Sequence, residues 1–172
     1  MTKAAYWING QQVQPEAFYE LACHPRRSVV VEACAGAGKT WMLVSRILRA
    51  LLEGIPPEQI LAITFTRKAA GEMRERLHQW LSELAAASPQ ALRQQLSLRG
   101  VPDHDMPRMQ EALQTLHADW ALGGRGVGLL TIHGWFAQLV KAAPLDVLAD
   151  LGLPPELALL ESHDEVWDEL WA

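Results

Sequence analysis

The sequence predicts an α/β fold in which a parallel sheet is flanked by helices. Short runs of apolar, often β-branched residues alternate along the chain with longer segments of helical spacing. A glycine-rich segment separates the first of these runs from the first long helix. The 172 residues are 49% hydrophobic and 20% charged, as in an ordinary globular domain. This composition excludes the disordered, collagen-like and coiled-coil classes.

The first half of the chain alternates between strands and helices. Ser28 to Glu32 is a β-branched run of the kind that forms a buried parallel strand. Apolar residues then recur at helical spacing from Trp41 to Leu52, and Gly54 is expected to end that helix. The run from Ile60 to Phe65 predicts a second strand. A long helix is expected from Lys68 to about Ala87.

The second half continues the alternation. Ser88 followed by Pro89 is a helix start signal, an N-cap and then a first helical residue, and Gly100 closes that helix. Further along, we predict a helix over Met106 to Leu122, a strand over Val127 to Ile132 and a helix from Gly134 to about Ala143. Ser162 and Glu165 have capping-box spacing, which predicts another helix start near the end of the chain.

The segment ACAGAGKT, from Ala33 to Thr40, carries the strongest chemical signal. A phosphate-binding loop needs backbone N–H groups that are free to point at anionic oxygens, and therefore small residues. The loop residues of this kind are Ala35, Gly36, Ala37 and Gly38. Lys39 is expected to lie between the β- and γ-phosphates, and Thr40 to give its hydroxyl to Mg²⁺. The sequence therefore predicts a P-loop nucleotide-binding protein, although Ala33 stands where the usual pattern has glycine.

A second motif narrows this class. Ile63 to Arg76, ITFTRKAAGEMRER, resembles motif Ia (TFTxKAAxEMxxR) of the UvrD/Rep-type superfamily-one DNA helicases. Thr131 to Gly134, TIHG, resembles motif Ib of that family, and the phosphate loop is similar to its motif I, which commonly begins with alanine. Gln14, followed by Glu16 and Ala17, resembles the glutamine motif, with Gln11 or Gln12 as alternatives. The residues of these motifs are most similar to those of the AddA/RecB helicase-nuclease branch.

The resemblance implies a RecA-like ATPase lobe that uses ATP and Mg²⁺. Gln14 is then expected to read the adenine, and Trp41, where many relatives carry arginine, either stacks on adenine or packs. The residues expected to face single-stranded DNA are Thr64, Phe65, Thr66, Lys68, Thr131 and His133. Phe65 offers a ring for base stacking, and Lys68 stands near a helix N-terminus, which favours phosphate. Core packing is the alternative for Phe65 and His133.

The charge is unevenly distributed. The net charge is -5, but eight acids and no Lys or Arg follow from Asp146 onward, leaving 15 basic and 12 acidic residues before it. Nucleic acid is therefore an admissible partner for the first 145 residues. A membrane is excluded, since no apolar run of 18 residues exists. Two cysteines suit a reducing, cytoplasmic compartment.

The resemblance also implies what the chain lacks. In that family a DExx strand follows motif Ib after an inserted helical domain, and a nuclease domain or subunit often accompanies the motor. We therefore expect residues 1–143 to form part of the first lobe, with a helical segment over about 68–122, and residues 144–172 to begin the inserted domain. Such a fragment would hydrolyse almost no ATP alone. The alternatives are a non-catalytic, nucleotide-dependent DNA-binding or interaction module and a small-molecule or nucleotide kinase.

Overall fold

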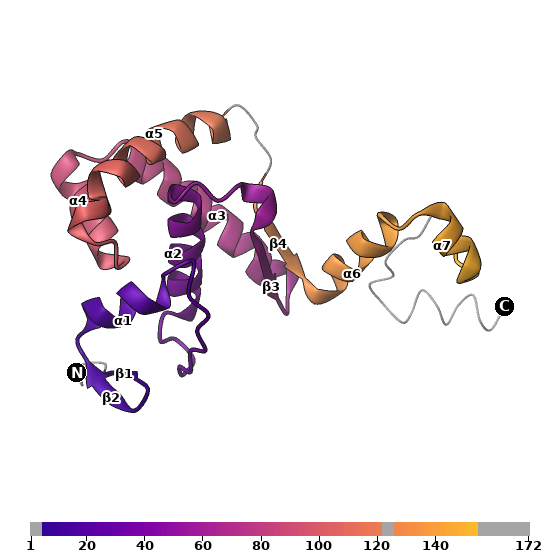
Figure 1. The fold of residues 1–172 in the computed structure, drawn as a ribbon, viewed down its shortest axis with the longest axis horizontal. Helices are drawn as coiled ribbons and strands as arrows, with labels where there is room; N and C mark the ends of the chain where they lie inside the picture. The colour runs from indigo at the N-terminus through magenta and orange to yellow at the C-terminus, as the bar shows by residue number, and fades with distance from the viewer. Residues whose placement is uncertain (1–4, 122–125, 155–172) are drawn as a thin grey trace. The chain divides into compact units, whose positions relative to one another are not determined.

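The computed structural model describes residues 5–121 and 126–154 (Figure 1). It divides into two compact units, Met1–Ala62 with Gly71–Gly128, and Ile63–Ala70 with Leu129–Ala172. The helix start predicted at Ser162 lies outside the described residues, as does the end of the helix predicted to reach Leu122. No helix in the described ranges is long and apolar enough to cross a membrane.

The first unit begins with a β-hairpin that sequence analysis did not predict. Strand β1 (Tyr6–Ile8) pairs antiparallel with β2 (Gln11–Val13). Asn9 and Gly10, with φ of 49° and 81°, form the two-residue turn between them. Asn-Gly is the strongest short-range hairpin signal, so this element was open to prediction. Helix α1 (Pro15–Ala22) follows and has proline in its first turn.

Four longer helices complete the first unit and confirm the predicted helices to within about two residues at most ends. They are α2 (Lys39–Leu52), α3 (Arg67–Ala85), whose first turn belongs to the second unit, α4 (Pro89–Leu98) and α5 (Met106–Ala121). Short 3₁₀ turns lie at Pro57–Gln59 and Asp103–Asp105. The Ser88 hydroxyl accepts a hydrogen bond from the Ala91 N–H at 3.3 Å, as its N-cap role requires.

The core of the first unit is helical. Each helix buries one stripe of residues spaced three or four apart, which is the pattern of an amphipathic helix. The fully buried members include Val44, Leu48 and Leu52 on α2, Leu77 and Leu81 on α3, Leu96 on α4, and Met106, Met109 and Leu113 on α5 or at its start. Helix α2 packs on α1 and α5, and α4 also packs on α1 and α5.

The strand predicted from Ser28 to Glu32 is wrong. This segment has no regular structure, and the side chain of Val30 is 95% exposed. The described strands pair as β1 with β2 and β3 with β4, so residues 28–32 have no neighbouring strand. A parallel strand forms only where it has hydrogen-bonding neighbours and covered faces. An apolar composition therefore did not suffice to form a strand here.

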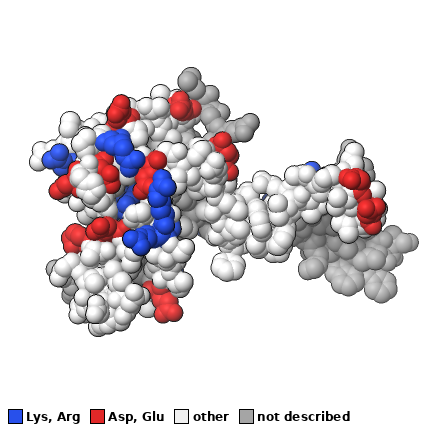
Figure 2. Space-filling model, in the orientation of Figure 1, with Lys and Arg blue, Asp and Glu red and all other residues white. Residues whose placement is uncertain are grey.

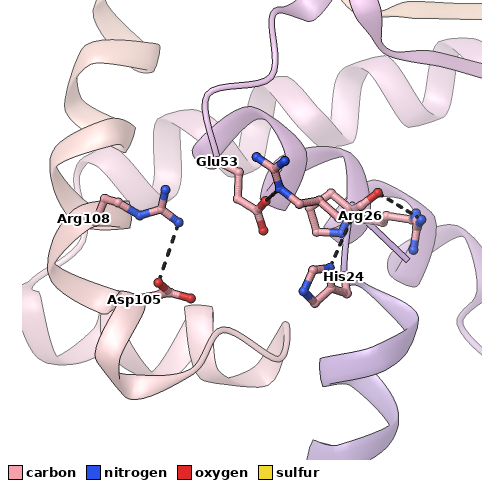
Figure 3. Close-up of polar contacts among 7 residues, drawn as sticks. His24, Arg26, Glu53, Asp105 and Arg108 are labelled. Carbon is pink, nitrogen blue, oxygen red and sulfur yellow. Dashed lines mark hydrogen bonds and ion pairs between the residues drawn. The ribbon is translucent and has the colours of Figure 1, made fainter. Parts of the chain in front are cut away.

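Polar contacts to α2 hold the chain just before that segment. Arg46 on α2 donates to the carbonyl oxygens of Ala22 at 3.1 Å, of Pro25 at 3.3 Å and of Arg27. Arg26 pairs with Glu53 at 3.1 Å, and its backbone N–H donates to Nδ1 of His24 at 3.2 Å (Figure 3). The same view shows Arg108 paired with Asp105 at 3.7 Å. Side chains, rather than a sheet ladder, fix the path into the glycine-rich loop.

Strands β3 (Leu61–Thr64) and β4 (Gly128–Thr131) form a small two-stranded parallel sheet. They confirm the two later predicted strands with slightly shorter bounds. Helix α6 (Ile132–Lys141) follows β4 directly, and α7 (Leu145–Asp150) comes after Pro144. The predicted α/β class is therefore confirmed, with two parallel strands in place of three.

Candidate functional site

The loop before α2 has the backbone that a phosphate site requires. Residues 33–40 are exposed, and Gly36 and Gly38 adopt φ of 77° and 84°, a region that residues with side chains rarely enter. Gly38 is also the N-cap of α2 and has no side chain to occupy the N–H groups of the first turn. Those N–H groups and the positive end of the helix dipole are suited to an anion.

Lys39 extends its ammonium back over this loop. Its Nζ donates to the carbonyl oxygens of Ala33 at 2.5 Å and of Cys34 at 2.7 Å. The Ala37 N–H also donates to the Cys34 carbonyl, at 3.2 Å, which closes the turn. A cation held at an uncapped helix N-terminus suits a polyphosphate, and the exposed Thr40 beside it offers a hydroxyl of the kind that ligates Mg²⁺. These residues therefore have the chemistry that a Mg²⁺-nucleotide needs.

A cavity of about 380 Å³ lies against the loop. Its walls come from the loop and from the N-terminal elements, and they include Tyr6, Trp7, Phe18, Tyr19, Ala37, Gly38, Lys39 and Met42. Sequence analysis missed the four aromatic residues. The sequence signal that could have revealed these residues is the Asn9-Gly10 turn. It predicts a hairpin, and a hairpin that carries Tyr6 and Trp7 brings their rings back toward α1.

The residue predicted to read adenine lies at the start of α1. Gln14 is exposed, and its backbone oxygen accepts a hydrogen bond from the Phe18 N–H at 3.2 Å. It is not among the residues that line the cavity. The alternatives Gln11 and Gln12 lie on β2 and are also exposed.

Trp41 packs among other side chains of the first unit. Its ring meets Tyr19 edge-on with centroids 5.2 Å apart and Trp80 with centroids 5.9 Å apart. The guanidinium of Arg99 lies 5.3 Å from the Trp41 centroid and 4.3 Å from that of Trp80. Burial lowers the pKa of Arg99 to about 10. Of the two roles open to Trp41, this arrangement favours packing.

The series of contacts between aromatic rings continues from Tyr19 to Tyr6 of the hairpin. The Tyr6 and Tyr19 hydroxyl oxygens lie 3.2 Å apart, within hydrogen-bond distance. Burial, together with that hydrogen bond, raises the pKa of Tyr19 to about 12. Phe18 contacts both rings, with centroids 5.0 Å from Tyr6 and 5.3 Å from Tyr19. The hairpin is thus fixed to α1 by aromatic packing.

The residues predicted to face DNA all belong to the second unit. Thr64 ends β3, and the Phe65 side chain after it is 96% exposed, so core packing does not explain this ring. The Thr66 hydroxyl accepts from the Ala69 N–H at 3.1 Å, and Lys68 stands exposed in the first turn of α3.

The other two residues that were predicted to face DNA, Thr131 and His133, lie at the end of β4 and just after it. Thr131 ends that strand and caps α6, accepting from the Gly134 N–H at 3.0 Å. His133 is exposed in the first turn of α6, so it is not a core histidine. Because β3 and β4 are parallel neighbours, Thr64 and Thr131 end at the same edge of the sheet, where such sheets bind ligands.

Few charged side chains lie on α6 and α7. The surface over α6 and α7 is mostly uncharged in Figure 2, apart from acidic groups over α7 and one small basic patch. From residue 129 to residue 154 the charged side chains are Lys141, Asp146 and Asp150. Over α6 and α7 a nucleic-acid contact would depend on hydroxyls and backbone groups more than on cations, and the cation of the predicted DNA-facing set is Lys68 at the start of α3.

The family found by comparison with known proteins agrees with the α/β fold class and with the motifs of this chain. The family model described as the UvrD/REP helicase N-terminal domain matches residues 14–162. The chain belongs to this family, as the resemblance of its motifs predicted. No solved structure matches it.

The similar proteins are ATP-dependent helicase/nuclease subunits of bacteria. The one from Streptococcus agalactiae is 40% identical over 106 residues, which are 60% of this chain and 8% of that protein. The one from Lactobacillus gasseri is 46% identical over 72 residues, 41% of this chain and 6% of its own length. That from Latilactobacillus sakei is 40% identical over 100 residues, 55% of this chain and 10% of its own. The chain thus spans about a tenth or less of these relatives, and the predicted likeness to the helicase-nuclease branch is confirmed.

Proposed function

We propose that this chain is the ATP- and single-stranded-DNA-binding N-terminal part of an ATP-dependent DNA helicase or translocase, with a RecA-like lobe. The observation that carries the proposal is the geometry before α2, where two glycines with positive φ, an uncapped helix N-terminus and the Lys39 ammonium come together. The names of the similar helicase/nuclease proteins support the same activity.

In this proposal Lys39 and Thr40 are the catalytic residues of the chain. The backbone of Ala35, Gly36, Ala37 and Gly38 surrounds the phosphates, Lys39 neutralises the β- and γ-phosphate charge, and Thr40 ligates the Mg²⁺ that accompanies ATP. The ion's role is to neutralise phosphate charge and orient the oxygens. Gln14, at the start of α1 and outside the lining of the cavity beside the loop, is proposed to read the edge of the adenine.

We propose that single-stranded DNA lies along the edge where β3 and β4 end. Phe65 supplies a stacking surface, and Lys68 and His133 lie in helix first turns, where phosphate is favoured. Thr66 and Thr131 use their hydroxyl oxygens as N-caps, but each O–H remains able to donate to a phosphate oxygen. Thr64 is the remaining member of this set.

Three further points complete the proposal. Hydrolysis needs a second Mg²⁺-holding carboxylate and a group that positions water, so we expect the 172-residue polypeptide alone to bind ATP with little turnover. Residues 1–143 belong to the motor lobe and 144–172 to an inserted helical domain. The free thiols of Cys23 and Cys34 suit the cytoplasm, where the parent protein acts on DNA ends with a nuclease domain or partner.

The test is to measure ATP and single-stranded DNA binding of the wild-type chain and of Lys39→Ala by calorimetry and fluorescence anisotropy. We expect Lys39→Ala to lose ATP binding and to keep DNA binding that weakens steeply with salt. Unchanged ATP affinity in this variant would remove the phosphate-loop assignment. Absence of DNA binding in both proteins would instead support a nucleotide-binding protein such as a kinase.

A further inference from the structure

We propose that Trp7 of the N-terminal hairpin is the residue on which the nucleobase stacks when the phosphate loop holds a nucleoside triphosphate. This proposal rests on the proposed function, because it places the base of the same ligand. It adds a wall of the binding site that none of the sequence motifs contains.

The position of the cavity identifies its occupant. Ala37, Gly38 and Lys39 of the phosphate loop and Tyr6 and Trp7 of the hairpin line the same space of about 380 Å³. This volume falls within the range of roughly 300–1,000 Å³ that is typical of small-molecule sites. A ligand whose phosphates occupy the loop therefore has an adjoining aromatic compartment for its non-phosphate part. A nucleobase, flat and apolar on both faces, is the group that such walls suit.

Trp7 is the ring with a free surface in this compartment. Tyr6, Phe18 and Tyr19 are joined to one another by ring contacts with centroids 5.0–5.6 Å apart, and all three are half-buried. The Trp7 side chain is 57% exposed, and no ring contact of Trp7 occurs among the described residues. A large exposed indole in the lining of a cavity is suited to stack on a ligand.

The hairpin holds this indole in place without needing it for packing. Trp7 lies opposite Gln12 in the antiparallel register, and its neighbours Tyr6 and Ile8 are the half-buried residues of the strand. The hydroxyl oxygens of Tyr6 and Tyr19 lie 3.2 Å apart, which ties the hairpin to α1. Replacement of Trp7 is therefore expected to leave the hairpin and the loop folded.

The experiment compares ATP with inorganic tripolyphosphate, which has the phosphates and no base. Affinities of the full 172-residue chain for each are measured by calorimetry in wild type, Trp7→Phe, Trp7→Leu and Lys39→Ala. We expect Trp7→Leu to weaken ATP binding about tenfold, since base–aromatic stacking has this magnitude, and to leave tripolyphosphate binding unchanged. Trp7→Phe keeps a ring and should stay within about threefold of wild type. Trp120→Ala, outside the cavity, is the matched control and should behave as wild type.

The outcomes separate the two proposals. If Lys39→Ala loses both ligands while Trp7→Leu binds ATP as wild type does, the phosphate loop stands and the Trp7 assignment is overturned. If Trp7→Leu loses ATP and tripolyphosphate alike, the residue supports the loop and not the base, which also overturns it. If Lys39→Ala still binds both ligands normally, the proposed function itself fails.

Discussion

Lys39 and Cys34 are joined by a hydrogen bond of 2.7 Å from the lysine Nζ to the cysteine carbonyl oxygen. The two residues bracket a turn that contains Gly36 and Gly38, so the bond brings the ammonium over backbone N–H groups of the same loop. The ammonium and the N-terminus of α2, which no side chain caps, thereby belong to the same loop. This local arrangement makes the loop suited to bind phosphate.

The loop geometry predicts a strong effect for Gly38→Ala. An alanine at φ of 84° costs about 1–2 kcal/mol, and relief of that strain would turn the first N–H groups of α2 away from the ligand. We expect ATP affinity to fall at least about tenfold in calorimetry. The control is Gly71→Ala within α3, where an added Cβ meets nothing within 4 Å. It should stabilise the fold by up to about 1 kcal/mol and keep normal ATP affinity. Equal ATP affinity in both variants would contradict the prediction.

Gly100 is predicted to be a critical packing position. A Cβ there would lie 2.3 Å from the backbone nitrogen of Glu20, and φ is 73°. Gly100→Ala should therefore lower the free energy of unfolding by about 3 kcal/mol, measured by urea denaturation. Gly54 has φ of 83° but open space around it, so Gly54→Ala should cost only about 1 kcal/mol. A similar loss in the two variants would show that strain, and not the contact with α1, dominates.

Stability is predicted to fall with alkaline pH because of Cys23. Burial raises the pKa of this thiol to about 11 from an ordinary value of 9.0, although Arg49, Arg46 and Arg99 oppose the shift. The thiol of the unfolded chain loses its proton from about pH 9, and the thiol of the folded chain only near pH 11. The contribution of the protonated thiol to the free energy of unfolding is therefore complete below pH 9 and is lost as the pH rises to 11.

Between pH 8 and pH 10 the titration of Cys23 should lower the free energy of unfolding by about 1 kcal/mol. Denaturant midpoints of wild type and Cys23→Ala over this interval provide the measurement. The difference between the two proteins should shrink as pH rises. A constant difference would mean that the folded thiol titrates normally.

Phe65 is predicted to matter for DNA and not for folding. Its side chain is 96% exposed, so Phe65→Ala should change the free energy of unfolding by less than about 0.5 kcal/mol. Loss of a stacking surface should weaken binding to a single-stranded oligonucleotide about 5- to 100-fold, measured by fluorescence anisotropy. Phe136→Ala, at another exposed phenylalanine of the second unit, is the control and should bind as wild type. Equal weakening by both variants would argue against a specific role for Phe65.

The helices were largely open to prediction because their signals are local. Ser88 with Pro89 set the start of α4, and Gly100, which was predicted to close that helix, follows its end with a φ of 73°. Helix α2 began two residues earlier than its first apolar residue, because Gly38 and not Trp41 determines the start. The hairpin was missed although its Asn-Gly turn is a local signal.

The sequence by itself determined the glycine turn before α2, the Ser88 cap and the positions of β3 and β4 to within about two residues. Each depends on a few consecutive residues, since conformations with positive φ and N-cap hydrogen bonds are decided within one turn of chain. Tertiary structure decided the rest. It left Ser28 to Glu32 without a strand partner, packed Trp41 against Tyr19 and Trp80, and placed Trp7 and Lys39 in the lining of the same cavity. Those outcomes depend on which surfaces meet after the chain has folded, and no local pattern specifies them.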